Sequence, residues 1–465
     1  MSPNSVFFDI IICPGFAANK SLTVFRTRFL ITQMKILDGI MEQGTKILQL
    51  LKQETAAAMG CTEPAAVALA CAHARAILSE EIKSAQILVS PNILKNGMGV
   101  GIPGTGLVGL DIAAGLGLII GKPESGLEVL SEVDADKVKQ ARELIQRGIL
   151  HVQLKQTDDK IWIEVLLESA SHRSRAIIRW RHNWLYRLEL DDQVLIYNDI
   201  DAPQAVPRID PGEFKLRDHY DFSRTVELSS LQELDLGITL NRAIAEYGLR
   251  EAVGISVGKA IMQQINSGVL GDDMHHYAMA LTAAATDARM GGCPLPVISN
   301  TGSGNQGLSI TLPIIAVAEK RACSEEQLLR ALTMGHLVSV HIKYKVGVLS
   351  CLCGCLSAAC GAACGIISLL GGDFPQMEYA IKNMIGNTAG MVCDGAKEGC
   401  SLKVATNTSA AVQAALLALS GICISANDGI ITGDIEDTIS NLAEFVNQGM
   451  NNADQTILNI MINKK

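Results

Sequence analysis

Two cysteines in the segment MVCDGAKEGC have a spacing that suits ligands of a metal group. Cys393 and Cys400 flank a short charged loop, in which Gly395 and Gly399 let the backbone turn around a bound group. A zinc site is not favoured, because no nearby histidine or C-x-x-C pair supplies the other half of a tetrahedral set. An iron–sulfur cluster accepts ligands from more distant segments. On spacing alone, a cluster and a pair of idle thiols both stay open.

A second set of cysteines is crowded into the segment CLCGCLSAACGAACG. If this segment were a single helix, Cys353, Cys360 and Cys364 would share one face, while Cys351 and Cys355 would share the other. Glycines 354 and 361 are the positions at which such a helix would break. Free cysteine usually behaves as a small buried hydrophobe. Most of these thiols are therefore expected in the core, together with Cys71, Cys293, Cys323 and Cys423.

Cys61 is a separate case, because a helix is predicted to start immediately after it. Thr62 is a good N-cap, and Pro64 is tolerated only in a first turn. The sulfur of Cys61 would then lie at the positive end of the helix, where a thiolate is stabilised and its pKa lowered. A reactive cysteine and a cysteine that merely precedes a helix are both consistent with this pattern.

Two segments match the pattern G-x-G-x-x-G, at residues 99–104 and 302–307. Neither predicts a dinucleotide site, because no βαβ unit surrounds either one. The second segment is expected to lead into a helix, whose first backbone N–H groups would bind a carboxylate or phosphate. The alternative is a glycine turn needed only for tight packing. The residues that would form this anion site are Ser303, Gly304, Asn305 and Gln306.

Composition restricts the class of partner. The net charge of -9 argues against a nucleic-acid surface. Hydrophobic residues make up 48% of the chain and glycines number 42, which favours closely packed helices. The uncharged stretches 346–372 and 409–426 are rich in small residues, so packed helices are favoured there over membrane spans. With thirteen cysteines and no export signal in residues 1–33, a reducing compartment, the cytoplasm, is expected.

The pattern along the chain predicts an α+β fold in four parts. Residues 1–33 resemble no other part and are expected to be a tail, or the product of a start codon placed too early. Residues 34–80 should form helices, over 34–59 and from Thr62, that pack on the catalytic domain. Residues 81–222 alternate β-formers and predict a smaller α+β module, with a hairpin turn at Asp158-Asp159 and a linker from 201 to 214. Residues 223–465 predict a large α-helical domain that carries the cysteines.

Taken in order, four motifs resemble the L-cysteine desulfidase family, which is related to the alpha chain of iron–sulfur L-serine dehydratases. These motifs are GCTEPAAVALA, SPNILKNGMGVGIPGTG, GSGNQG and CDGAKEGC. The resemblance extends from about Met34 to the C-terminus. It implies a [4Fe–4S] cluster bound by Cys353, Cys393 and Cys400, with Cys351 or Cys355 as alternatives to Cys353. It also implies that Cys61 is catalytic, as a base or as a displaceable fourth ligand. Where relatives carry a His-Thr-Asn step, only His182 and Asn183 match, and their role is open.

The resemblance predicts β-elimination of L-cysteine to sulfide, ammonia and pyruvate, without pyridoxal phosphate. The open iron would act as a Lewis acid on the substrate, the loop at 302–307 would bind its carboxylate, and Glu63, beside Thr62, its ammonium group. The first alternative is elimination from L-serine or L-threonine on the same scaffold. A non-catalytic small-molecule-binding protein and a nicotinamide-dependent enzyme are alternatives of other classes. Small-residue-rich helices also make a homodimer plausible.

Overall fold

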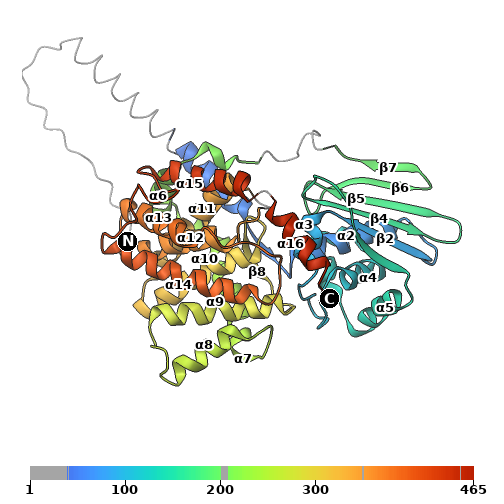
Figure 1. The fold of residues 1–465 in the computed structure, drawn as a ribbon, viewed down its shortest axis with the longest axis horizontal. Coiled ribbons are helices and arrows are strands. Elements are labelled where there is room, and N and C mark those ends of the chain that lie inside the picture. Colours follow the sequence, from blue (N-terminus) through green and yellow to red (C-terminus); the bar gives the residue numbers. More distant parts are fainter. Residues whose placement is uncertain (1–38, 40, 200–207, 348–349, 451, 465) are drawn as a thin grey trace, which may run out of the picture. The chain divides into compact units, whose positions relative to one another are not determined.

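The computed structural model describes residues 39, 41–199, 208–347, 350–450 and 452–464. The proposed tail at residues 1–33 lies outside them. The chain divides into two compact units, Met1–Gln49 and Leu50–Lys465. In the first unit the described residues are helical. The second unit contains both a six-stranded sheet and most of the helices (Figure 1). The predicted combination of a large helical part with a smaller α+β module is confirmed.

The sheet has the strand order β3-β2-β4-β5-β6-β7. Strand β2 (Ser84–Val89) pairs in parallel with β3 (Leu150–Leu154) and antiparallel with β4 (Trp162–Glu168). The predicted hairpin at Asp158-Asp159 is therefore wrong: β3 and β4 are adjacent in sequence, but β2 lies between them. The alternation of apolar and polar residues predicts that each segment is a strand. It does not predict which other strand each one pairs with.

The other strands are β5 (Arg173–Arg179), β6 (Leu185–Leu190) and β7 (Gln193–Tyr197), each antiparallel to the strand before it. Asp191 and Asp192 join β6 to β7, and both have positive φ, as a two-residue type I′ turn requires. The basic residues of this region form ion pairs along the strands, for example Arg175 with Glu164. These pairs hold the basic side chains against acidic neighbours on the sheet.

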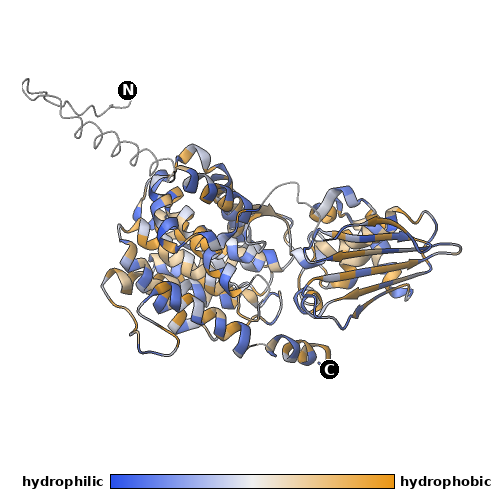
Figure 2. Ribbon diagram, turned by 90° about the horizontal axis from the view of Figure 1, so that it is seen from above, coloured by the Kyte–Doolittle hydropathy of each residue, from blue (hydrophilic) through white to orange (hydrophobic). Residues whose placement is uncertain are grey.

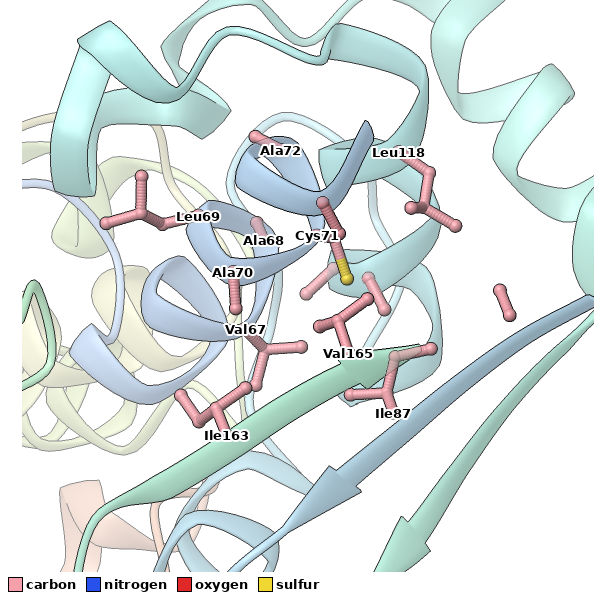
Figure 3. Packing of buried hydrophobic residues seen from close by; sticks show 14 of the residues in the cluster. Val67, Ala68, Leu69, Ala70, Cys71, Ala72, Ile87, Leu118, Ile163 and Val165 are labelled. Atoms are coloured by element: carbon pink, nitrogen blue, oxygen red, sulfur yellow. The ribbon is translucent and has the colours of Figure 1, made fainter. Parts of the chain in front are cut away.

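Helix α2 (Thr62–Ala76) lies on this sheet together with α4 (Leu110–Ile120), and their apolar side chains form one core with those of β2 and β4 (Figure 3). We had expected α2 to pack on the helical domain. Its alanine-rich middle is buried on all sides, so the pattern gives no single face from which the partner could be read. The preceding predicted helix is also shorter than expected, because helical structure ends at residue 54 and β1 (Thr55–Ala58) follows.

Three more segments complete the sheet module. They are α3 (Pro91–Gly97), η1 (Pro123–Glu132) and α5 (Ala135–Gln146), which lie between β2 and β3 in the sequence. Residues 200–207 of the predicted linker lie outside the described residues. After it, η2 (Pro211–Glu213) and α6 (Leu216–Thr225) contact α11 (Glu325–Val346). The helical part therefore begins before the expected boundary at residue 222.

The helical part packs its helices closely, as the glycine content predicted. A Cβ atom on Gly361 would lie 2.2 Å from the carbonyl oxygen of Gly335, so α11 and α12 (Cys355–Leu369) approach at backbone distance. Figure 2 shows apolar and polar residues interleaved along these helices. The others are α7 (Gln232–Arg250), α8 (Val257–Asn266), α9 (Met274–Met290), α10 (Gly304–Arg321), α13 (Phe374–Thr388), α14 (Cys400–Leu419), α15 (Ile435–Glu444) and α16 (Ala453–Ile462).

Two smaller features interrupt this pattern. Short η3 (Leu228–Ser230) precedes α7, and the π-helical turn η4 (Phe445–Gly449) follows α15. The prediction of helix alone after the linker is incomplete, because β8 (Val297–Asn300) pairs antiparallel with β1. Within the described ranges, none of the helices combines the length and the apolar composition that crossing a bilayer requires.

Candidate active site

One pocket of about 200 Å³ collects most of the residues that the sequence singled out. Its volume is smaller than the roughly 300–1,000 Å³ typical of ligand pockets, so it suits a small molecule. It is lined from the start of α2, from α3, from the end of α9 and from the segments that precede α10, α12 and α14. The predicted site residues in its lining are Cys61, Thr62, Glu63, Ser303, Asn305, Gln306, Cys353, Cys393 and Cys400.

Cys61 is the N-cap of α2, and Thr62 is its first helical residue, so the prediction that Thr62 is the cap is wrong. The Thr62 hydroxyl instead donates to the carbonyl oxygen of Gly302, 3.2 Å away, which joins α2 to the glycine loop. The expected fall in the pKa of Cys61 is also wrong. Burial raises the pKa of this thiol, and the neighbouring Arg289 guanidinium only opposes the rise, because the side chain is almost wholly removed from water.

The glycine loop at 302–307 leads directly into α10, as the sequence predicted. Ser303 is the N-cap, and its hydroxyl accepts a hydrogen bond from the amide of Gln306. The Gln306 carboxamide oxygen accepts from Ser357, 3.1 Å away on α12. These two polar groups are therefore occupied within the protein. The loop follows the short antiparallel strand β8, and no parallel βαβ unit surrounds it among the described residues, so the geometry disfavours a dinucleotide site.

Gly304 lies in the loop but does not line the pocket. A Cβ atom at this position would lie 2.4 Å from Nε of Arg289. The glycine therefore makes room for a guanidinium group that does line the pocket. Gly304 belongs to the sequence motif, but the close contact that requires a glycine at this position is with Arg289, which lies outside the motif.

Cys353 and Cys393 lie next to each other because their segments pair over a short distance. The amide of Cys353 donates to the carbonyl of Met391, and the amide of Cys393 donates to the carbonyl of Cys351. Leu352 and Val392 form an antiparallel bridge between them. This pairing brings the crowded cysteine segment to the loop before α14, although nothing in either segment alone indicates it.

The prediction that five cysteines divide between two helix faces is wrong, because α12 begins only at Cys355. Cys353 and Cys355 both line the pocket, whereas Cys351 does not. Cys360 and Cys364 are fully buried inside α12. All described cysteines are free thiols. The structure thus leaves Cys353 and Cys355 as the pocket cysteines of this segment.

The thiols of the pocket differ in their electrostatic surroundings. The hydrogen bond from the Cys355 thiol lowers the pKa of Cys353 to about 6, and Cys355 itself is raised well above its ordinary pKa. Burial raises the pKa of Cys400 to about 11 and also raises that of Cys393. Lys343, on α11, is 4% exposed and lines the same pocket; burial lowers its pKa, while nearby cysteines oppose that change.

Several functional candidates were not identified from the sequence. Four buried polar atoms of pocket residues have no hydrogen-bond partner among the described residues, which is unusual in a folded protein and points to a polar ligand. These atoms are Asn96 Oδ1, His182 Nε2, Arg289 Nε and Ser350 Oγ. The role of His182 was left open by the sequence; it lies in the turn between β5 and β6, where burial lowers its pKa and Glu63 opposes the effect. Arg289 and Lys343 carried no motif signal.

Lys95 supports the cysteine loop from the sheet module. Its ammonium group lies 2.5 Å from an Asp454 oxygen on α16 and 3.2 Å from the carbonyl oxygen of Cys393. Only 2% of Lys95 is exposed. A Cβ atom on Gly395 would lie 2.2 Å from the carbonyl oxygen of Lys95, so the loop and α3 are in direct backbone contact.

The donor set of the pocket fits an iron–sulfur cluster better than a single ion. Among the described residues, no three His, Cys, Asp or Glu side chains are grouped closely enough to hold one metal ion. A cluster of several iron and sulfide ions is larger, so its thiolates need not converge on one point. Five thiols in one small pocket, with no disulfide among the described cysteines, provide the soft sulfur ligands that such clusters require.

Together, these features define a mainly helical protein with a mixed sheet module and a buried, cysteine-lined polar pocket. The chain belongs to the serine dehydratase alpha chain family, whose model matches residues 124–459. The resemblance inferred from the motifs is thus confirmed at the level of this family of iron–sulfur serine dehydratases, while the specific L-cysteine desulfidase assignment stays a prediction.

Close relatives cover almost the whole chain. The UPF0597 protein of Alkaliphilus oremlandii is 44% identical over 424 residues, which are 90% of this chain and 99% of the relative. The UPF0597 protein of Oleidesulfovibrio alaskensis is 41% identical over 423 residues, 91% of this chain and 99% of the relative. A UPF0597 protein of Bacteroides fragilis is 41% identical over 420 residues, 90% and 98% of the two chains.

Proposed function

We propose that this chain is an iron–sulfur lyase that removes the β-substituent of a small amino acid, with L-cysteine as the first candidate. The observation that carries the proposal is the meeting of Cys61, Cys353, Cys393 and Cys400 in one small polar pocket. The family's serine dehydratase name supports the class of reaction. The four motifs favour L-cysteine as the substrate.

The cluster is proposed to be bound by Cys353, Cys393 and Cys400, and it would supply a Lewis acid for the leaving group. Lys343 is placed to offset the negative charge of the thiolates, because its ammonium group is buried beside them. The backbone pairing of residues 351–353 with 391–393 would hold two of the ligands at a fixed separation.

In the proposed reaction, a base removes the α-proton of L-cysteine and the Cβ–S bond breaks, so that hydrosulfide leaves and aminoacrylate forms. Hydrolysis of the tautomeric imine then gives pyruvate and ammonia. Glu63 is proposed to bind the substrate ammonium group, since Asn96 holds one of its carboxylate oxygens. Thr62, Ser303, Asn305 and Gln306 shape the substrate side of the pocket. Cys61 would act as the base or as a displaceable ligand, and Arg289 would favour its thiolate in either role.

Elimination of water from L-serine or L-threonine is the second candidate, and the family name favours it. The two candidates share every step except the leaving group. Hydrosulfide leaves readily, whereas hydroxide needs activation by the metal. A polar pocket of this size admits either β-substituent.

The test is an assay of the anaerobically purified and reconstituted protein with L-cysteine and L-serine, measuring sulfide, pyruvate and ammonia. Iron and acid-labile sulfide are measured on the same sample. We expect bound iron and turnover of L-cysteine that exceeds turnover of L-serine. Bound cluster without turnover of either amino acid would reject the lyase, and protein without iron would favour a non-catalytic binding role.

A matched pair of variants separates the two proposed roles of the cysteines. Cys393→Ser should lose the cluster and the activity together, because a proposed ligand is removed. Cys61→Ser should lose activity while keeping most of the iron. If Cys61→Ser also loses the iron, Cys61 is a cluster ligand in the resting protein.

A further inference from the structure

Arg289 is a buried cation in the pocket, and no carboxylate of the described residues neutralises it. It comes from the last turn of α9, only 5% of its surface is exposed, and it lines the pocket. Among the described residues, no Asp or Glu lies within ion-pair distance of its guanidinium group. Its hydrogen bonds to oxygen go to neutral acceptors, the Gly60 carbonyl and the Asn305 side chain. A charge buried in this way is unfavourable unless an anion completes the site.

The guanidinium group is held in one position from three sides. Its Nη2 atom lies 2.6 Å from the carbonyl oxygen of Gly60, directly before Cys61. Its Nη1 atom lies 2.9 Å from Oδ1 of Asn305 in the glycine loop. Gly304 covers Nε, since a Cβ atom there would come within 2.4 Å. Arg289 also forms a hydrogen bond with the Cys61 side chain, so three of its five N–H donors are used and two remain for a ligand.

The other charged groups of the pocket do not provide an anionic partner for Arg289. Of the other buried cations in the lining, Lys95 is paired with Asp454, and Lys343 lies close to Cys353, Cys355 and Cys393. Arg289 and Glu63 are the two charged neighbours of Cys61, with opposite signs. A zwitterion beside Cys61 would therefore meet a cation and an anion.

We propose that Arg289 binds the α-carboxylate of the amino-acid substrate. Asn305 holds the guanidinium group in position, and the missing side chain of Gly304 leaves space for it. This inference rests on the proposed function for the choice of an amino acid as ligand. The sequence predicted that the glycine loop at 302–307 itself binds the carboxylate, and this inference adds a contact from Arg289. The Ser303 hydroxyl and the Gln306 carboxamide oxygen accept hydrogen bonds from within the protein, and the Asn305 side chain holds the guanidinium group, so the loop contributes to carboxylate binding through Arg289 as well. Bidentate pairing of guanidinium with carboxylate is the geometry that such a site would use.

The test measures binding without turnover, on the reconstituted protein under anaerobic conditions. L-alanine has the substrate skeleton but no β-leaving group, and L-alaninamide differs from it by a neutral amide in place of the carboxylate. Calorimetric titration should show tighter binding of L-alanine to the wild type. Arg289→Met should weaken L-alanine binding by about ten- to a hundredfold, as expected for loss of hydrogen bonds to a charged group, and change L-alaninamide binding little.

Two further variants control for structural damage. Lys382→Met removes a buried cation that lies outside the pocket, where it donates to the carbonyl oxygen of Gly433, and it should leave the ratio of the two affinities close to that of the wild type. Gly304→Ala keeps every charge but displaces the guanidinium group, so it should reduce the ratio as Arg289→Met does. Circular dichroism and iron content check that each variant is folded and loaded.

The outcomes separate this inference from the lyase proposal. Equal affinity of the wild type for both ligands, binding of neither, or equal weakening of both by Arg289→Met would overturn the carboxylate assignment. Selective L-alanine binding that depends on Arg289, in a protein that turns over neither L-cysteine nor L-serine, would keep the assignment and reject the lyase.

Discussion

The amide of Cys393 donates a 2.6 Å hydrogen bond to the carbonyl oxygen of Cys351, although the two residues lie far apart in the sequence. Cys351 thus contributes its backbone to the site, while its sulfur does not line the pocket. The next cysteine along, Cys353, does line it. We therefore expect Cys351 to contribute only its backbone carbonyl to the site, and Cys353 to contribute its sulfur as a cluster ligand.

This difference predicts the effect of serine substitutions in the CLCGC segment. Cys353→Ser should lower the iron content of the reconstituted protein to a small fraction of the wild-type value. Cys351→Ser should retain it, because the hydrogen bond to Cys393 uses the backbone. Cys355→Ser should also retain it, since a hydroxyl can still donate to the sulfur of Cys353. Iron analysis and visible absorbance measure the outcome; iron loss in Cys351→Ser with retention in Cys353→Ser would reverse the assignment.

A second prediction concerns acid stability and the buried His219 on α6. Burial, with a smaller effect of His341, lowers the pKa of His219 to about 3, compared with 6.5 for an ordinary histidine. Between these values the unfolded chain binds a proton that the folded protein excludes, so stability falls as the pH drops below about 6.5. Neither ring nitrogen of His219 forms a hydrogen bond with any residue that the structure describes. His219→Phe should therefore keep or raise the free energy of unfolding at pH 7 and flatten its fall towards pH 4.

Urea unfolding from pH 7 to pH 4 measures this slope. The control is His172→Gln on the sheet, where an exposed histidine bonds to Asp191 and its pKa is raised. That contribution is present at low pH and is lost as the pH rises, so the acid slope due to His219 should persist in the control. An unchanged slope in His219→Phe would show that His219 does not cause the acid sensitivity.

The sequence was informative where local chemistry decides the outcome. Spacing in CDGAKEGC drew attention to Cys393 and Cys400, which both line the pocket, and the loop before α10 was recognisable from its glycines. Local rules failed at Cys61, where the helix start suggested a thiolate but burial dominates the pKa. The favourable effect of a helix terminus is about 1 kcal/mol, which is smaller than the desolvation of a fully buried thiolate.

Contacts between distant segments were not predictable. Arg289 belongs to no motif, and its importance follows only from its contacts with Gly60, Gly304 and Asn305. Lys343 similarly lies in an ordinary helix end. The predicted partner of α2 was wrong for a related reason: a helix buried on every side carries no amphipathic signal.

A third prediction tests the close packing of α11 against α12. Gly361→Ala would place a methyl group 2.2 Å from the Gly335 carbonyl oxygen, so the helices must separate. Overpacking of this kind costs about 1–3 kcal/mol. Gly390→Ala is the matched control, because nothing lies within 4 Å of its Cβ position. Thermal unfolding should show a clear decrease for Gly361→Ala alone; equal midpoints for both variants would mean that the interface can relax without loss.

The last prediction concerns Lys95, which joins the cysteine loop to α16. Lys95→Met leaves Asp454 and the Cys393 carbonyl without their cation, and breaking such a buried pair costs about 3 kcal/mol. Because the loop carries a proposed ligand, we also expect faster release of iron to a chelator. Lys122→Met is the control, since its pair with Glu132 is exposed and should contribute little to stability. If Lys95→Met lowers stability but releases iron at the wild-type rate, Lys95 holds α16 without restraining the cysteine loop.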